Sequence, residues 1–517
     1  MAERYVIGVD GGTESLRAGV FDLQGRPRGF ASSPYSTIFP QPSWAEQNPD
    51  DWWRALGWAV RQVMQEAKIR PDEVAALSVD TTCCSVVALD AAGKPLRPAL
   101  IWMDVRSGDV AAEVAVSGDP ALEVNSAGAG PVSAEWMVPK ALWLHRHERA
   151  LFDRAIHVCE FQDYINYHLT GRMVASICNA SVRWHYDSRR GGYQPSLLRC
   201  VGLEALLEKW PRDVLPLGEV IGGLTAAAAE HLGLPKGLPV AQGGADAFIA
   251  MIGLSVVRPG RLALITGSSH LQLGVSDKPL HGKGIWGTYP DAVIPDLYIV
   301  EGGQTSTGSI VNWLKHLLPD SISYDELNAE AKALPPGAEG LVVLDHFQGN
   351  RTPYTDANAR GVISGLTLKH GPAHLYRAII EGVAFGTALI FETMRASGFS
   401  PKEVVICGGS TRSDLWMQIH ADTAGLPLVL TEVADAPALG SAILAAVGAG
   451  CYSNMIEASD AMVRVVRRIE PHRARHEAYQ PFYEAYRDTY PAIAAIVHRQ
   501  TRIGCWRPKA TTPCLGG

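Results

Sequence analysis

The chain has 517 residues, which is too long for a single hydrophobic core and predicts at least two domains. Charged residues make up 19% and apolar residues 47% of it, the balance of an ordinary globular protein. Its net charge of −7 leaves no basic surplus to neutralise phosphates, so no nucleic-acid partner is expected. The sequence also predicts no secretory signal and no membrane span. Because its 9 cysteines form no CxxC pair with zinc spacing, we expect reduced thiols and a cytoplasmic protein.

The segment Tyr5–Asp22 predicts a hairpin that faces an anion. An apolar run ends on Asp10, the tight turn Gly11–Thr13 follows, and a second apolar run closes the segment. The backbone N–H groups and hydroxyls of such a turn suit nucleotide phosphates and their magnesium ion. An ordinary N-terminal hairpin with a polar tip is the alternative interpretation.

The rest of the N-terminal half predicts a mixed α/β pattern in which helices cover a sheet. Asn48, Pro49 and Asp50 supply a cap and a first turn, so a helix is expected to follow them. The other expected elements are a strand at 29–35, a buried strand at 74–79 with its hairpin partner at 85–90, a helix at 160–171, and a strand or loop at 177–186.

The C-terminal half begins near Leu238 and contains a second hairpin, 261–277, that is similar to the first. Each hairpin has an apolar run, a bend with glycine and hydroxyls, a second apolar run and a closing aspartate. We therefore expect two related domains that face one cleft, with chance resemblance between two hairpins as the alternative.

The segment 404–430 is the clearest strand–turn–helix–strand unit of the C-terminal half. The glycine pair Gly408–Gly409 ends the strand and allows a ligand to approach the backbone, and Ser410–Thr411 is expected to cap the helix. Farther on we expect a tightly packing small-residue helix at 438–450 and aromatic core residues at 479–490, followed by a loose tail.

Asp246 is the candidate catalytic base, because it follows a glycine pair at the end of a strand, among apolar residues. A carboxylate there can accept the proton of a substrate hydroxyl as its oxygen attacks a phosphorus atom. The alternatives are a helix N-cap for Asp246 and, for Asp10, a turn-forming role in place of magnesium binding. The sequence contains neither GxxxxGKS/T nor GxGxxG, which excludes the common mononucleotide and dinucleotide loops.

Together these motifs resemble the FGGY carbohydrate kinases, which share the fold of actin, hexokinase and Hsp70-like ATPases. The resemblance runs from Tyr5 to about Tyr490 and is carried by GVDGGTESLRAGVFD, ITGSSH and CGGSTRSDLWMQIHADTAGLPLVLTEVADAPALGSAI. It implies an α/β fold with two actin-like (ribonuclease H-like) domains, whose mixed sheets are flanked by helices and whose interdomain cleft is catalytic. The expected domains are 1–252 and 253–495, and 496–517 is expected to be a loose tail.

Further segments are similar to bacterial ribulokinases and D-ribulose kinases, namely SVDTTCCSVVALD, WMDVR, SAEWMVPKALWL, EGGQTSTGSIVNWL and FQGNRTPYTDANARGVISGL. This similarity implies an enzyme that uses ATP and Mg2+ to phosphorylate the terminal hydroxyl of a ketopentose, with ribulose as the first choice. Another ketose or polyol (xylulose, ribitol, erythritol or erythrulose) and a non-catalytic sugar or nucleotide sensor are the alternatives. A homodimer is expected by analogy alone.

The resemblance also implies roles for single residues. Asp246 would be the base and, with Asp10, a magnesium ligand. The implied sugar-binding residues are Asp80, Thr82, Cys83, Glu135, Trp136, Arg183, Asp246 and Glu301. The implied ATP-binding residues are Gly12, Thr13, Glu14, Ser15, Arg17, Gly267, Ser268, Gln304, Gly308, Gly408, Gly409 and Ser413.

Several of these residues have a plain structural alternative. Glu301 could cap a helix that starts near Thr307, and Cys83 with Cys84 could simply pack within a strand. For three tryptophans, core packing is the alternative to stacking on a sugar, namely Trp44, Trp102 and Trp136.

Three charged residues bear on substrate identity more than on reaction type. Arg183 stands where ribulokinase-like relatives carry lysine, and its planar fork is expected to change which hydroxyls are read. Glu14 lies where polyphosphate would sit and either aids a cation or points away. Arg106 is expected to stabilise the loop of Asp104 rather than to contact a ligand.

Overall fold

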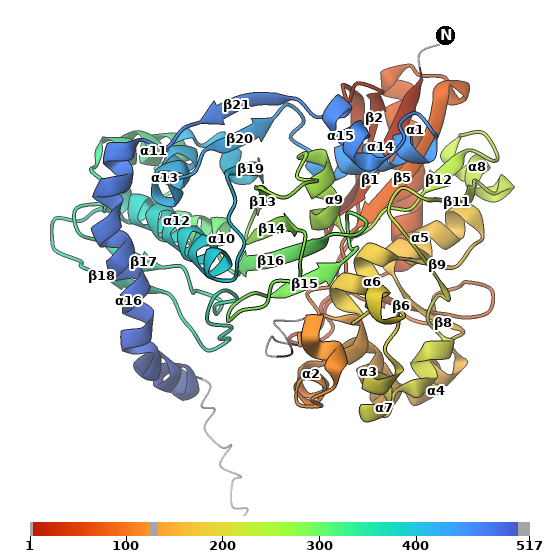
Figure 1. The fold of residues 1–517 in the computed structure, drawn as a ribbon, viewed down its shortest axis with the longest axis horizontal. Coiled ribbons are helices and arrows are strands. Elements are labelled where there is room, and N and C mark those ends of the chain that lie inside the picture. The colour runs from red at the N-terminus through yellow and green to blue at the C-terminus, as the bar shows by residue number, and fades with distance from the viewer. Residues whose placement is uncertain (1–3, 125–127, 129–131, 505–517) are drawn as a thin grey trace, which may run out of the picture.

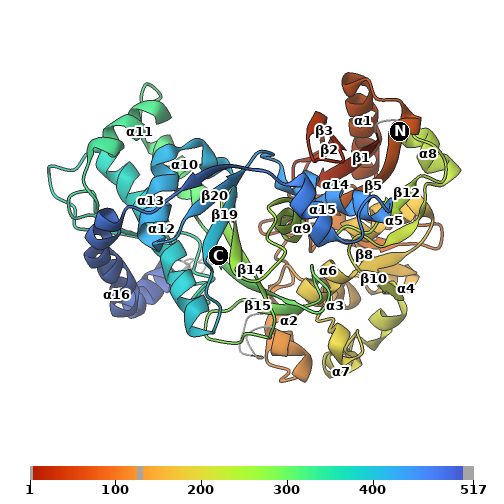
Figure 2. The same ribbon diagram turned by 45° about the horizontal axis from the view of Figure 1, so that its top comes forward.

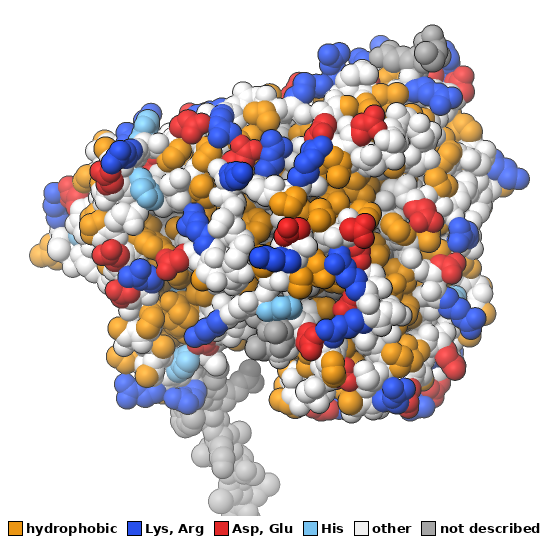
Figure 3. Space-filling model, in the orientation of Figure 1, with side chains coloured by type: hydrophobic (Ala, Val, Ile, Leu, Met, Phe, Trp, Pro, Cys, Tyr) orange, Lys and Arg blue, Asp and Glu red, His pale blue; other side chains and the backbone are white. Residues whose placement is uncertain are grey.

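The computed structural model describes residues 4–124, 128 and 132–504. They form two lobes, each built around a mixed β-sheet that helices cover (Figure 1). The expectation of two mixed sheets flanked by helices is thus confirmed. Positive and negative side chains are interspersed over the face of the molecule shown in Figure 3.

The large sheet of the N-terminal lobe has six strands in the order β11-β12-β5-β1-β2-β3. Its strands are β1 (Tyr5–Gly11), β2 (Ser15–Asp22), β3 (Pro27–Pro34), β5 (Val74–Thr81), β11 (Val220–Gly223) and β12 (Pro239–Ala241). β1 and β2 form the expected antiparallel hairpin, and β5 runs parallel to β1. Asn48 caps α1 (Pro49–Ala67) as expected, and the apolar face of this helix covers β2 and β3.

Residues 85–90 do not form the expected hairpin with 74–79. The strand in that segment belongs to a separate sheet, in which it pairs with β7 and β8. Cys84 adopts a left-handed backbone conformation, with φ at 64°, and this turns the chain away from β5 before the next strand begins. The separate sheet comprises β4 (Glu46–Gln47), β6 (Val86–Leu89), β7 (Ala99–Leu100) and β8 (His157–Glu160).

Residues 177–186 contain a helix, α6 (Ile177–Arg183), rather than the expected strand or loop. Ser176 caps it by accepting a hydrogen bond from the Cys178 N–H. Every residue of α6 is buried, so the sequence shows no alternation of polar and apolar faces there.

The N-terminal half contains further short helices and a small two-stranded sheet. α5 (Phe161–Thr170) ends at Gly171 as expected. The remaining elements are α2 (Gly108–Ala115), α3 (Met137–His147), α4 (Arg149–Arg154), α7 (Pro195–Cys200), α8 (Ala226–Leu232), α9 (Asp246–Gly253), β9 (Val174–Ser176) and β10 (Asp213–Leu215).

The sheet of the C-terminal lobe has seven strands in the order β15-β16-β14-β13-β19-β20-β21. Its strands are β13 (Arg261–Thr266), β14 (His270–Ser276), β15 (Gly287–Pro290), β16 (Tyr298–Gln304), β19 (Glu403–Gly408), β20 (Leu428–Thr431) and β21 (Val465–Ile469). β13 and β14 form the second expected hairpin, and β19 runs parallel to β13. The other elements are α10 (Gly308–Leu317), α11 (Tyr324–Ala333), α12 (Pro372–Ala396), α13 (Asp414–Ala424), α16 (Arg473–Gly504), β17 (Val342–Leu344) and β18 (Val362–Ser364).

The cap of α13 differs from the expected one. Ser413, and not Ser410 or Thr411, accepts a hydrogen bond from the Trp416 N–H, at 3.3 Å. Ser410 and Thr411 lie one turn earlier, in a short 3₁₀ helix that separates β19 from α13. Gly425 ends α13 in a left-handed conformation, as expected.

Among the described residues, α12 is the one helix that is long and apolar enough to cross a membrane by length and composition alone. Of its most apolar stretch, 89% is buried inside the molecule. It packs against α11, α13 and β17. This burial is typical of a core helix.

α14 (Ala436–Gly448) and α15 (Met455–Met462) come late in the chain but lie against the N-terminal lobe, as Figure 1 and Figure 2 both show. A Cβ atom added to Gly8 of β1 would lie 1.9 Å from the Ala438 carbonyl oxygen. One added to Gly253 of α9 would lie 2.0 Å from the Ala436 carbonyl oxygen. The expected small-residue helix therefore packs at backbone contact, in the lobe opposite to that of its sequence neighbours.

The first part of the expected loose tail, 496–504, instead continues α16. There the Thr501 hydroxyl donates to the Asn358 carbonyl oxygen at 3.2 Å, and His498 Nε2 lies 2.6 Å from Asp356 Oδ2. Residues 505–517 of the expected tail lie outside the described residues. Of the aromatic residues expected in the core at 479–490, Tyr479, Tyr486 and Tyr490 are buried, and Phe482 and Tyr483 are half-buried. Every cysteine in the described part of the chain is a free thiol.

Candidate active site

A cavity of about 300 Å³ lies between the two halves of the chain. The N-terminal half contributes the tip of its hairpin, the turn after β5 and the start of α9, and the C-terminal half contributes its own hairpin tip. The lining residues that bear polar groups are Thr13, Thr82, Cys83, Cys84, Trp102, Glu135, Arg183, Asp246, Thr266, Ser269 and Arg351. Of the predicted residues, the structure brings together at this cavity Thr13 and Gly267 of the phosphate set and Thr82, Cys83, Glu135, Arg183 and Asp246 of the sugar set.

The tips of the two hairpins are each closed by a backbone hydrogen bond from a glycine, and the second tip is one residue shorter than the first. The Gly12 N–H donates to the Ser15 carbonyl oxygen at 3.0 Å, and the Gly267 N–H donates to that of Ser269 at 2.9 Å. Gly308 supports the second tip from below, because its N–H donates to the Gly267 carbonyl oxygen at 3.2 Å. A Cβ atom at Gly308 would lie 2.5 Å from that oxygen, so only glycine fits.

The third glycine turn lies beside the second hairpin. Gly408 pairs with Thr266 across the parallel strands β19 and β13 and has φ at 97°. A Cβ atom there would lie 1.8 Å from the Thr266 carbonyl oxygen, whereas one at Gly409 would meet nothing within 4 Å. Gly408 therefore closes the turn, and the open space at Gly409 leaves room for a ligand.

Asp246 is the first residue of α9 and lines the cavity. Its Oδ1 accepts the N–H of Ala247 at 2.7 Å, and Ala245 occupies the cap position without a side-chain bond. Burial raises the pKa of Asp246 to about 6, against the opposing effects of the Ala247 N–H and Arg183. The carboxyl is thus poised to exchange a proton near neutral pH.

Asp246 belongs to a cluster of carboxyl groups. Asp10 lies beside Asp80 in the register of β1 and β5. Burial, followed by the charges of Asp435 and Asp246, raises the pKa of Asp10 to about 7. Arg17 offsets part of this charge, but it is exposed and paired with Asp435.

The cluster fits a divalent cation, because its negative charge exceeds the nearby positive charge. No three His, Cys, Asp or Glu side chains of the described residues form a complete ligand group. Mg2+ would therefore take its other ligands from phosphate oxygens and water, which is its usual preference. Asp10 and Asp246 would be its protein ligands.

Asp80 lies elsewhere than its expected sugar-binding role requires. It is fully buried, and its Oδ2 accepts the hydroxyl of Ser441, on α14, at 2.6 Å. Its Oδ1 has no partner among the described residues. Asp80 is therefore part of the acidic cluster behind the cavity and of the contact with α14.

Arg183 and Glu301, expected as separate sugar ligands, form one buried ion pair. Arg183 Nη1 donates to Glu301 Oε2 and Nη2 donates to Oε1, each at 3.0 Å. The Tyr289 hydroxyl adds a bond to Oε2 at 2.7 Å. Glu301 is fully buried in β16 and does not cap α10, whose cap is Thr307. The pair joins α6 to the C-terminal sheet, and Arg183 alone reaches the cavity.

Three further residues of the expected sugar site differ in exposure. Cys83 and Glu135 line the cavity, whereas Trp136 is 1% exposed and lies beneath it. The Trp136 ring centroid is 5.5 Å from the guanidinium carbon of Arg183. Trp136 is thus a core residue that supports Arg183.

Other expected ATP residues act within the protein. Gln304 is buried, donating to Asp345 and to Val383 and accepting from Gln272 and Thr387. Ser413 caps α13, as described above. Glu14 is exposed at the edge of the first hairpin tip, and its carboxylate accepts no hydrogen bond from another described residue.

Sequence reasoning missed two charged residues of the site. Arg351 lines the cavity, with its guanidinium 4.6 Å from the Trp286 ring centroid and its Nη1 3.8 Å from Glu301 Oε1. It lies in FQGNRTPYT, a segment that the sequence marks without singling out the arginine. Asp435 belongs to the acidic cluster, since its charge raises the pKa of Asp10. Its position directly before the small-residue helix α14, where it caps the helix, is the sequence feature that could have identified it.

The Cys83–Cys84 turn in the cavity wall is held by two buried ionisable groups. Glu160 Oε2 accepts the Cys84 N–H at 3.0 Å. Lys140 Nζ donates to the Cys84 carbonyl oxygen at 2.7 Å and to that of Ile101 at 2.6 Å. Lys140 therefore ties the turn to the loop that carries Trp102, another cavity residue.

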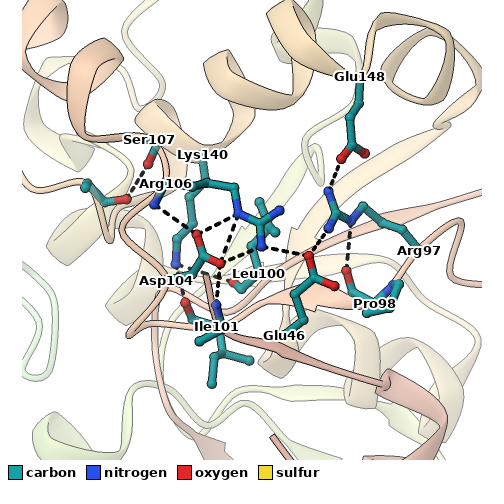
Figure 4. Close-up of polar contacts among 12 residues, drawn as sticks. Glu46, Arg97, Pro98, Leu100, Ile101, Asp104, Arg106, Ser107, Lys140 and Glu148 are labelled. Atoms are coloured by element: carbon teal, nitrogen blue, oxygen red, sulfur yellow. Dashed lines mark hydrogen bonds and ion pairs between the residues drawn. The ribbon is translucent and has the colours of Figure 1, made fainter. Parts of the chain in front are cut away.

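Figure 4 shows this lysine beside a second group of charges. Arg106 Nε donates to Asp104 Oδ1 at 2.9 Å, and its Nη2 donates to Glu46 Oε1 at 2.7 Å. The guanidinium lies 3.6 Å from the ring centroid of Trp44. The prediction that Arg106 stabilises the Asp104 loop is confirmed, and Trp44 packs against it. Trp102 lies apart, donating to the Thr13 hydroxyl at 2.8 Å.

Known proteins of similar sequence and structure show the family to which the chain belongs. Models of the FGGY family of carbohydrate kinases match residues 5–253 (N-terminal domain) and 262–449 (C-terminal domain). An FGGY carbohydrate kinase domain-containing protein of Xenopus laevis is 33% identical over 536 residues, covering 94% of this chain and 96% of the relative. The ribulokinase of Shouchella clausii is 32% identical over 528 residues, covering 94% of each chain.

The crystal structure of xylulose kinase from Rhodospirillum rubrum is similar with a TM-score of 0.86 and 31% sequence identity, covering 96% of this chain and 100% of that one. Its fold and the family models both span the two lobes that enclose the cavity. The chain therefore belongs to the FGGY family of carbohydrate kinases, and it is a sugar kinase with the two-domain actin-like fold.

Proposed function

We propose that this sugar kinase transfers the γ-phosphate of ATP to the terminal hydroxyl of a ketopentose, with ribulose as the first candidate. FGGY kinases use ATP as phosphate donor. A relative named ribulokinase and a similar structure named xylulose kinase support a ketopentose acceptor. Ribulose and xylulose differ in configuration at one carbon atom.

Asp246 carries the proposal. It lines the cavity together with residues of the second phosphate turn and of the sugar wall. With a pKa near 6 it is ionised at neutral pH and is a stronger base than an ordinary aspartate. In the proposed step the sugar hydroxyl oxygen attacks the γ-phosphorus, Asp246 accepts the hydroxyl proton, and ADP leaves.

The other groups position the reactants and exclude water. The hairpin tips at 12–15 and 267–269 would hold the phosphates, and the glycine turn at 408–409 would admit the adenosine portion. Mg2+ bound by Asp10 and Asp246 would neutralise phosphate charge. Closure of the two lobes would keep water, a competitor of the sugar hydroxyl, away from the γ-phosphate.

One observation favours a second candidate, another ketose or a polyol. Both terminal nitrogens of Arg183 donate to Glu301. The two side chains therefore bond each other, and fewer charged groups remain for the sugar hydroxyls than if Arg183 and Glu301 were separate sugar ligands. Thr82, Glu135 and Arg351 are among the other polar residues that line the cavity. Loss or gain of one hydroxyl contact shifts preference strongly.

The test is an ADP-release assay with ATP, Mg2+ and a panel of ketopentoses, tetruloses and polyols. We expect ribulose to give the highest kcat/KM, and Asp246→Asn to lower it by about 100-fold or more. Asp325→Asn, which changes an exposed carboxylate in the first turn of α11, is the matched control and should behave as the unchanged protein. Full activity in Asp246→Asn, or no stimulation by any sugar, would contradict the proposal.

We also propose a cytoplasmic location and, by analogy with related kinases, a homodimer. The free thiols of the described residues support the first of these. Light scattering of the purified full-length chain tests the second, with a mass twice that of the chain as the expected result and a monomer mass as the contrary one.

A further inference from the structure

Two adjacent thiols, Cys83 and Cys84, lie in the cavity wall, and the proposed reaction makes no use of their sulfur chemistry. Their sulfur atoms are 3.8 Å apart, with the Cys84 thiol donating to Cys83 Sγ. Cys83 is half-buried and faces the cavity, whereas Cys84 is 2% exposed and packs against Trp136 and Trp286. Solvent can thus reach one thiol through the cavity, and the second thiol lies directly behind it.

The backbone holds the two residues unequally. Glu160 and Lys140 fix the N–H and the carbonyl oxygen of Cys84, as described above, and keep it in a left-handed conformation that is strained for a residue other than glycine. No hydrogen bond joins the backbone of Cys83 to another described residue. The thiols are therefore held in contact while Cys83 keeps freedom to move.

We propose that Cys83 and Cys84 form a modification site, a vicinal dithiol that hydroperoxides oxidise to a disulfide and thiol reductants restore. The Cys83 thiolate attacks one peroxide oxygen, the O–O bond breaks, and Cys83 becomes a sulfenic acid while the other oxygen leaves as an alcohol or water. The Cys84 sulfur then displaces the sulfenic hydroxyl, which leaves as water with the Cys84 proton. Two thiols and one hydroperoxide thus give one disulfide, one water, and one alcohol or second water.

The order of the two steps follows from the surroundings of each thiol. Cys83 is the accessible group and so meets the oxidant first. Burial raises the pKa of the Cys84 thiol well above its usual value, which keeps that thiol protonated until the sulfenic acid forms beside it.

The disulfide is expected to be readily reversible. Adjacent Cα atoms are about 3.8 Å apart, which is below the roughly 4.4–6.8 Å found across most disulfides. Such a departure from ordinary geometry makes a disulfide easier to reduce, as is typical of regulatory disulfides.

Formation of the bond reshapes the sugar wall. The sulfur atoms must approach from 3.8 Å to about 2.0 Å. Glu160 and Lys140 hold Cys84, and the Thr82 N–H donates to the Gly11 carbonyl oxygen at 2.9 Å. The movement therefore falls on Cys83, which lines the cavity. A displacement of about 1 Å beside the reacting groups lowers turnover by tenfold or more. This loss rests on the proposed function, whereas the disulfide itself does not.

The test treats the purified full-length protein with hydrogen peroxide and follows peptide mass and sugar-dependent ADP release, before and after dithiothreitol. We expect the peptide with residues 83 and 84 to lose two hydrogen atoms, and ADP release to fall by about tenfold or more. Dithiothreitol should restore both. Binding of a fluorescent ATP analogue should not change, because the phosphate turns lie outside the moving segment.

Single substitutions separate the two thiols. Cys84→Ser removes the second thiol, so Cys83 should gain two or three oxygen atoms, and dithiothreitol should no longer restore activity. Cys83→Ser should leave the mass of this peptide unchanged under peroxide. Cys200→Ser, which changes an exposed thiol at the end of α7, is the matched control and should respond to peroxide as the unchanged protein does.

Four results would overturn the inference. Three of them contradict the modification site: no mass change, irreversible oxidation of Cys83 in the unchanged protein, and a disulfide between Cys83 and the nearby Cys178. The fourth, a Cys83–Cys84 disulfide that leaves an active kinase at full turnover, contradicts the inferred effect on the sugar wall. A reversible Cys83–Cys84 disulfide in a protein that no sugar stimulates would support the modification site and contradict the proposed function.

Discussion

The two sides of the cavity are built in different ways. The proposed nucleotide side consists of the turns at 12–15, 267–269 and 408–409, which backbone hydrogen bonds and glycines shape, and at Gly408 and Gly308 a Cβ atom would have no room. The sugar side consists of the turn at 82–84, α6 and β16, where buried charged side chains hold the wall. One side is therefore shaped by local backbone conformation and the other by ion pairs and hydrogen bonds between distant residues.

This difference teaches where each side is sensitive to change. The turn at Gly408 fails when a Cβ atom is added there, because the clash is with backbone that cannot move aside. A wall held by buried charges fails when one partner is removed, because the other charge stays buried without compensation. Substitutions on one side of the cavity at a time therefore test this difference.

The largest effect is expected from breaking the buried ion pair of the sugar side. Arg183→Met should destabilise the protein by about 3–5 kcal/mol, because Glu301 then remains buried and unpaired. Urea unfolding measures this change. The matched control is Arg258→Met, which loses the exposed pair with Asp460 and should cost less than about 1 kcal/mol. Equal costs for the two variants would show that the Arg183 pair does not hold the wall.

The conservative change Arg183→Lys tests whether the planar guanidinium of Arg183, and not its charge alone, determines sugar preference. Lysine keeps the charge but cannot bond both oxygens of Glu301 with a planar fork. We expect it to retain most of the stability and to shift the ranking of sugars in the ADP-release assay. An unchanged ranking would remove Arg183 from the residues that determine specificity.

A smaller loss is expected on the nucleotide side. Gly408→Ala should cost about 3 kcal/mol, since it places a Cβ atom 1.8 Å from the Thr266 carbonyl oxygen at a residue with φ of 97°. Gly409→Ala, which meets nothing within 4 Å, is the neighbouring control and should change stability by no more than about 0.5 kcal/mol. The free energy of unfolding of both variants decides the prediction, and similar values would contradict it.

The smallest effect concerns Asp246, where the two sides meet. Its pKa is raised to about 6, so the carboxyl gains a proton, and the base is lost, as the pH falls through that value. We expect kcat/KM for the sugar to fall tenfold or more per pH unit below about 6, at least about 1.4 kcal/mol per unit, and to level off above about 7, where Asp10 is ionised as well. A profile that stays level down to the pKa of an ordinary aspartate would contradict the assignment.

Much of the fold follows from short patterns in the sequence. Both hairpins, the cap of α1 at Asn48 and the strand–turn–helix unit after β19 are confirmed, because each depends on residues close together in the chain. Two expectations are wrong, the strand or loop at 177–186 and the hairpin partner at 85–90, because the pattern of residues there does not show the local structure. α6 is buried all round and shows no helical period, and the left-handed Cys84 breaks a hairpin that two apolar runs predict.

The sequence by itself determined the backbone turns of the nucleotide side and the place of Asp246 directly after a glycine pair, between β12 and α9. Only the tertiary structure decided the sugar side. Arg183 and Glu301 lie 118 residues apart in the chain, and α14 returns to pack on β1. Turn conformation is set by each residue and its neighbours, so it leaves a local pattern. A buried charge is stable only beside its partner, and the fold alone brings the two together.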